Sequence, residues 1–212
     1  PSIGRLTRYR PPSEFQSSEY IVRNDTGVFE GGEISMYYDP MIAKLCTWAP
    51  TRSEAIAHMR KALDGFEVEG IGHNLPFLSA VMDHPRFIKG DITTAFIEEE
   101  YPEGFIGVEL PESELLRIAA SCAAMNRVAE IRRTKISGRM DNHERRVGDN
   151  WVVTLQNNKY ELNIVADQLG STVRFEDGLR IRVEGSWTPG DQLANMLVDD
   201  TRLTMKVGKL SL

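Results

Sequence analysis

The chain lacks several features that mark common functional classes. Its 212 residues include two cysteines, Cys46 and Cys122, and without a CxxC spacing they predict neither a disulfide framework nor a metal site, which fits a reducing compartment. No apolar run approaches the roughly 20 residues that span a bilayer, and no signal segment opens the chain. The net charge of -6 argues against a general nucleic-acid or anionic-membrane surface. We therefore expect a soluble protein that binds neither nucleic acid nor a membrane.

Sequence motifs for several kinds of chemistry are missing as well. The histidines are scattered without an HExxH or Cys/His spacing, so we expect no metal site. No GxSxG motif is present and neither cysteine has an obvious activating partner, which argues against covalent hydrolase chemistry. The glycines of residues 27–32 follow neither the Walker spacing nor the Gly-x-Gly-x-x-Gly spacing, and we interpret them as a hairpin turn.

The first half of the chain mixes strands with short helices. Thr51 and Glu54 have the spacing of a capping box, and the apolar stripe that follows predicts a helix that ends at Gly65. The other predicted elements are a helix from Asn74 to Met82, a helix from Thr93 or Thr94 that stops before Pro102, and strands at 21–22, 27–29 and 42–48. Together they indicate an antiparallel α+β subdomain.

The second half begins with the longest predicted helix, residues 111–133, whose middle is apolar on nearly all sides. Such a helix must be enclosed by other elements. Period-two alternation then predicts short strands separated by turns, at 151–155, 160–164, 173–175, 179–183 and 203–207. We expect an antiparallel barrel that wraps the helix.

Between the helix and the first of these strands lies a basic segment, residues 134–150, which we name the hook loop. It is longer than the usual connection of about 4 to 6 residues. Three interpretations remain open: a solvated loop without a binding role, a docking element whose arginines contact carboxylates of a partner, or an RNA-binding segment. The absence of interleaved aromatic residues argues against RNA.

Two blocks, PSIGRLTRY at residues 1–9 and ISMYYDPMIAKL at residues 34–45, resemble the C-terminal subdomain of biotin carboxylases. The runs at 70–74, 90–96 and 101–105 are most similar to the biotin-carrying subunit of propionyl-CoA carboxylases, and the helix-in-barrel pattern resembles the biotinyl-transfer (BT) domain of that family. The implied fold class is α+β. Residues 1–106 would form the biotin carboxylase subdomain, and residues 107–212 the BT domain, with the helix at 111–133, the hook loop at 134–150 and a truncated barrel at 151–212.

The resemblance implies an ATP-dependent ligase that forms carbon–carbon bonds. Such an enzyme carboxylates biotin with ATP, Mg and bicarbonate and passes the carboxyl group to propionyl-CoA on a carboxyltransferase beta subunit. The expected partners are that subunit and the biotin carboxyl carrier domain of the parent chain, in a hetero-oligomer of the bacterial cytoplasm or the mitochondrial matrix. The chain begins with Pro and contains no ATP-grasp residues and no biotin-attachment motif, so we expect an excised piece of a longer polypeptide that is inactive alone. Alternatives are a 3-methylcrotonyl-CoA or other acyl-CoA carboxylase, and a noncatalytic assembly scaffold.

The resemblance also assigns candidate site residues. Arg8 takes the position of an arginine that stabilises negative charge on the ureido oxygen of biotin, for which a fixed guanidinium is suited; its alternative is a surface arginine at a strand end. Tyr38, Asp39 and Lys44 would form the active-site floor, with a buried Asp39 orienting Arg8. The expected partner-binding residues lie at the end of the predicted helix and in the hook loop that follows it: Arg132, Arg133, Ile136, Arg139, Met140, Arg145 and Arg146.

Overall fold

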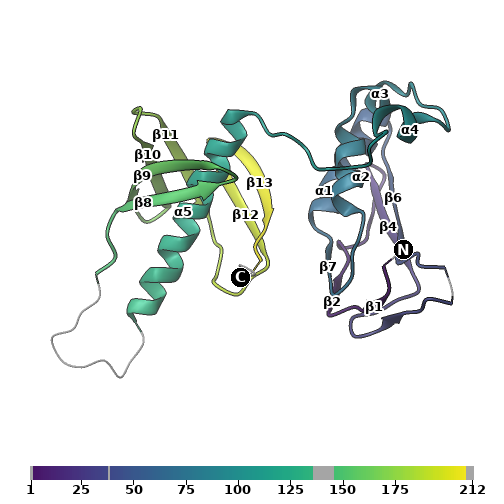
Figure 1. Cartoon of the computed structure of the whole chain (residues 1–212), viewed down its shortest axis with the longest axis horizontal. Helices are drawn as coiled ribbons and strands as arrows, with labels where there is room; N and C mark the ends of the chain where they lie inside the picture. Colours follow the sequence, from purple (N-terminus) through teal and green to yellow (C-terminus); the bar gives the residue numbers. More distant parts are fainter. Residues whose placement is uncertain (1, 38, 136–145, 209–212) are drawn as a thin grey trace. The chain divides into compact units, whose positions relative to one another are not determined.

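The computed structural model describes residues 2–37, 39–135 and 146–208. The chain forms two compact units, Pro1–Val108 and Glu109–Leu212, which we call unit 1 and unit 2 and describe separately (Figure 1). None of the helices in these described ranges is long and apolar enough to cross a membrane.

Unit 1 contains three small antiparallel sheets. They are β1 (Gly4–Arg5) with β5 (Glu33–Ile34), β2 (Arg8–Arg10) with β7 (Glu67–Glu69), and the order β3-β4-β6, formed by β3 (Phe15–Gln16), β4 (Ile21–Thr26) and β6 (Ala43–Trp48). The strand predicted at 27–29 is wrong, because residues 27–29 form a loop. The hydroxyl of Thr26 accepts a hydrogen bond from the backbone N–H of Val28 and offers the chain an alternative to the sheet ladder.

The described part of unit 1 also contains four helices (Figure 1). They are α1 (Arg52–Asp64), α2 (Leu75–Asp83), α3 (Pro85–Lys89) and α4 (Phe96–Glu100). The predicted capping box is confirmed, since the Thr51 hydroxyl accepts from the Glu54 N–H and the Glu54 carboxylate accepts from the Thr51 N–H. Asn74 is the N-cap residue of α2, as the predicted start of this helix indicates, but its side chain makes no capping hydrogen bond.

Unit 2 consists of one long helix and one six-stranded antiparallel sheet whose strands follow the order of the sequence. Figure 1 shows the curled sheet around the helix. The elements are α5 (Glu112–Thr134), β8 (Asn150–Leu155), β9 (Asn158–Ala166), β10 (Gly170–Phe175), β11 (Arg180–Gly185), β12 (Leu193–Val198) and β13 (Thr201–Lys206). The predicted helix inside an antiparallel meander is therefore confirmed.

Small side chains allow α5 to lie inside the sheet. Ala119 and Ala120 are fully buried, and so are Ile164 and Val173 on the facing strands. Complete burial of an aliphatic side chain such as Ile164 contributes about 1.5 to 3 kcal/mol. The buried Ser121 is compatible with this core because its hydroxyl donates to the backbone carbonyl of Arg117, at 2.9 Å.

Candidate functional site

Arg8 lies on β2 and forms an ion pair with Glu67 of the neighbouring strand β7. The Nε atom of Arg8 donates to Oε2 of Glu67, and the two side chains are only 22% and 12% exposed. The strands carry complementary patterns, Arg-Tyr-Arg on β2 and Glu-Val-Glu on β7. Sequence analysis missed Glu67, which lies opposite Arg10 in the register and reaches Arg8 diagonally across the strand pair; the alternation of opposite charges on the two strands was a usable signal. The pair gives Arg8 a structural role, because it ties the two strands together.

In the described residues, no hydrogen bond or ion pair joins Arg8 to Asp39 or Lys44 of the predicted active-site floor. Asp39 is exposed rather than buried, and its carboxylate accepts a hydrogen bond from the backbone N–H of Met41 at 2.9 Å. Lys44 is exposed on β6. Tyr38 lies outside the described residues. The partner that orients Arg8 in this structure is Glu67, and a chemical role for Arg8 stays a prediction.

The predicted partner-binding residues divide into two groups. Arg132 and Arg133 belong to the last turn of α5, where Arg133 pairs with Glu130 and the Arg132 guanidinium approaches the carbonyl of Pro189 at 3.5 Å. Arg146 is exposed. The remaining members of the set, Ile136, Arg139, Met140 and Arg145, lie outside the described residues.

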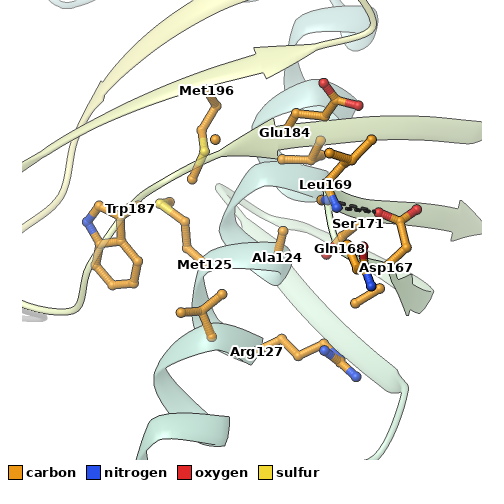
Figure 2. A pocket seen from close by; sticks show the side chains of 15 residues that line it. Ala124, Met125, Arg127, Asp167, Gln168, Leu169, Ser171, Glu184, Trp187 and Met196 are labelled. Atoms are coloured by element: carbon orange, nitrogen blue, oxygen red, sulfur yellow. Dashed lines mark hydrogen bonds between the residues drawn. The ribbon is translucent and has the colours of Figure 1, made fainter.

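Unit 2 also contains a pocket of about 300 Å³ that sequence analysis did not identify (Figure 2). It lies between α5, the β9–β10 turn, and the strands β11 and β12, and its labelled lining includes Met125, Trp187 and Met196. Arg127 contributes a guanidinium whose Nε atom is buried without a hydrogen-bond partner in the described residues. The pocket thus combines an apolar wall with the guanidinium of Arg127, which pairs with Asp149 at 3.5 Å, and with the carboxylates of Asp167 and Glu184.

An acidic turn at the rim of this pocket is held by Arg182. Its two terminal nitrogens donate to both oxygens of Asp167, at 2.6 and 2.8 Å, and its Nε atom donates to Glu184 at 3.0 Å. This bidentate contact, with help from the N–H groups of Leu169 and Gly170, holds the pKa of Asp167 well below its usual range. Asp167 is therefore a fixed anion with a structural task and not a proton donor near neutral pH.

The described residues contain no group of His, Cys, Asp and Glu side chains that could hold a metal ion. Burial raises the pKa of the Cys122 thiol, which favours the neutral and unreactive form. Cys122 is therefore not an activated nucleophile in this structure.

Comparison with known proteins places the two units in two families. Residues 1–99 match the family described as Biotin carboxylase C-terminal domain, and residues 118–212 match the Propionyl-coenzyme A carboxylase BT domain. A curated Propionyl-CoA carboxylase alpha chain from Ruegeria pomeroyi is 69% identical over an alignment that covers 100% of this chain and 33% of that protein. The mitochondrial alpha chain of Rattus norvegicus is 34% identical, over 97% of this chain and 28% of that protein.

Among solved structures, a complete multifunctional pyruvate carboxylase from Rhizobium etli matches 62% of this chain and 12% of its own, with 36% identity and a TM-score of 0.45. The chain spans about a third of the length of the curated relatives, 33% of the bacterial protein and 28% of the rat protein.

Proposed function

Because the chain joins a biotin carboxylase C-terminal domain to a propionyl-CoA carboxylase BT domain, it belongs to the biotin-dependent acyl-CoA carboxylases, and we propose that it is part of a propionyl-CoA carboxylase alpha subunit. The observation that carries the proposal is the 69% identity to such an alpha chain across all of this chain. The parent subunit would carboxylate biotin with ATP, Mg and bicarbonate, and a carboxyltransferase beta subunit would pass the carboxyl group to propionyl-CoA. Its compartment would be the bacterial cytoplasm or the mitochondrial matrix.

The described residues do not themselves fit a nucleotide, magnesium or biotin-attachment site. They hold no cluster of metal-binding side chains, and the sequence has no Walker glycine pattern. We therefore assign these groups to other parts of the parent subunit and the chemical step to a composite site. This chain by itself is proposed to be inactive in biotin carboxylation.

Unit 2 is proposed to connect the carboxylase part of the subunit to the beta subunit. The support is its match to the BT family and the two arginines of the last turn of α5, Arg132 and Arg133, which lead into the hook loop; the loop itself contributes the exposed Arg146. Guanidinium groups form paired hydrogen bonds with carboxylates, which suits them to an acidic patch on a partner. A purely noncatalytic scaffold is the alternative of another class. On that alternative, biotin-dependent ATP turnover by the complete subunit recovers together with stability when Arg8 and Glu67 are replaced together.

A charge-matched pair of variants tests this assembly role in the complete alpha subunit. We expect changing Arg139, Arg145 and Arg146 to Ala to weaken association with the beta subunit at least tenfold, which is about 1.4 kcal/mol. The control changes Arg174, Arg180 and Arg202, which are exposed on strands of unit 2, and removes the same charge. Analytical ultracentrifugation or surface plasmon resonance measures both. Equal affinities for the two variants would rule out the hook loop as the contact.

A 3-methylcrotonyl-CoA carboxylase subunit is the nearer rival. The alpha subunit of the methylcrotonoyl-CoA carboxylase of Dictyostelium discoideum is 34% identical over an alignment that covers 61% of this chain. The BT match of residues 118–212 favours the propionyl enzyme, since the matched family is defined on propionyl-CoA carboxylases.

A further inference from the structure

The pocket of unit 2 has an apolar interior and an apolar rim (Figure 2). Its inner wall contains Met125 of α5, Met196 of β12 and Trp187 of the loop between β11 and β12. Methionine side chains adapt their shape to an inserted group. Val128 and Leu169 also line the pocket, and they are 46% and 77% exposed. Exposed apolar side chains that continue an apolar pocket in this way mark a surface that another protein covers.

Each charged side chain that lines the pocket has a partner of opposite charge. Arg182 donates to Asp167 at 2.6 and 2.8 Å and to Glu184 at 3.0 Å. Arg127 pairs with Asp149 at 3.5 Å. A charged guest would compete with these pairs, whereas an uncharged side chain leaves them intact and loses no hydration of its own charge. The volume of about 300 Å³ lies at the lower end of the range for small-molecule pockets. The pocket therefore suits a bulky apolar side chain.

The rim of the pocket adjoins the last turn of α5, from which the hook loop departs. Val128 of the rim precedes Arg132 by four residues, which is about one helical turn. The Arg132 guanidinium donates to the carbonyl of Pro189 at 3.5 Å, and Pro189 belongs to the same loop as Trp187. Protein interfaces commonly combine an apolar centre with a charged and polar rim. The pocket supplies the apolar part directly beside the arginines that we assign to the beta subunit.

We propose that this pocket is a socket for a bulky apolar side chain of the carboxyltransferase beta subunit, separate from the hook loop and next to it. We call it the apolar socket and define it by Met125, Val128, Leu169, Trp187 and Met196. This inference rests on the proposed contact between unit 2 and the beta subunit. It gives that contact a part that salt does not weaken, because burial of apolar surface does not depend on charge, whereas exposed arginine–carboxylate contacts are screened.

Two uncharged double variants of the complete alpha subunit test the socket. Val128→Gln with Leu169→Gln makes its rim polar and should weaken association with the beta subunit at least tenfold, equally at low and at high ionic strength. The control is Asn126→Gln with Leu179→Gln, at exposed positions of α5 and of the β10–β11 turn that do not line the pocket. Surface plasmon resonance should give the control the affinity of the unchanged subunit. Equal affinities of the two double variants would overturn the proposal.

Hydrogen exchange locates the contact without any carboxylase assay. When the beta subunit is added to the complete alpha subunit, amides of residues 167–170 and 186–190 should exchange at least tenfold more slowly, and those of the turn at 176–179 should not change. A complex that forms without this protection would overturn the socket and leave the contact through the hook loop intact. Failure to form any complex would overturn both. Protection in the alpha subunit alone, relative to the 212-residue chain, would also overturn the proposal, because another segment of the alpha subunit would then fill the pocket.

Discussion

Replacing Arg8 by Met is expected to lower the free energy of unfolding of the complete subunit by about 3 kcal/mol, because it leaves the Glu67 carboxylate desolvated without its partner. The Glu67 side chain is only 12% exposed. Changing both residues, Arg8→Met with Glu67→Gln, should restore most of this loss, since no charge then remains unpaired. Chemical denaturation of Arg8→Met, of Glu67→Gln alone and of the double variant gives the coupling energy.

The same strand supplies the control for this prediction. Arg10 approaches Glu30 at 3.7 Å, and both side chains are about half exposed, at 57% and 46%. Exposed pairs contribute about 0 to 1 kcal/mol, so Arg10→Met should change stability little. If Arg8→Met were no more destabilising than Arg10→Met, the ion pair with Glu67 would have no structural importance.

The double variant also decides whether Arg8 has a chemical role. The resemblance to biotin carboxylases predicts that a guanidinium at this position stabilises charge on the ureido oxygen of biotin. In that case the double variant recovers its stability but remains defective in biotin-dependent ATP turnover. Turnover that recovers together with stability would assign Arg8 to structure alone. The free energy of unfolding and the rate of biotin-dependent ATP turnover are both measured on the same preparation of the double variant.

Ala120→Asp is the second change with a large expected effect, since it introduces a carboxylate where the side chain has no exposure at all. An unpaired buried charge costs several kcal/mol, which is a large part of the roughly 5 to 15 kcal/mol that stabilises a domain. We expect unit 2 to lose its tertiary packing and the subunit to lose its affinity for the beta subunit. Hydrogen exchange in α5 and β9 reports the first effect, and a binding titration reports the second.

Asn126→Asp is the matched control, because it adds the same charge at an exposed position of the same helix. It should leave both the exchange rates and the titration close to those of the unchanged protein. Slow exchange in α5 of the Ala120→Asp variant would mean that the helix is not enclosed by the sheet as the structure has it.

The elements best predicted from the sequence are those with strong local signals. The capping box at Thr51 fixes the start of α1, and the apolar circumference of the predicted helix at 111–133 correctly indicated an enclosed helix, α5. The turn at Asp199 and Asp200 also has local causes, since both residues adopt positive φ, as a two-residue hairpin turn requires.

The contacts between side chains from distant segments could not be predicted from local sequence signals. Glu67 reaches Arg8 across 59 positions of sequence, and Arg182 reaches Asp167 only because β10 pairs with both β9 and β11. The burial of Asp39 was expected from the resemblance and not from a local pattern, and the structure has this side chain exposed. The pairing of strands therefore determines which of these side chains meet, and local sequence patterns do not predict that pairing.

The central claim of this account is that the chain is a working part of a propionyl-CoA carboxylase alpha subunit. The most direct measurement is ATP-dependent incorporation of labelled bicarbonate into acyl-CoA by the complete parent subunit together with its beta subunit. The account predicts carboxylation of propionyl-CoA that disappears when either subunit is omitted. No incorporation with propionyl-CoA, or incorporation with 3-methylcrotonyl-CoA in its place, would contradict it.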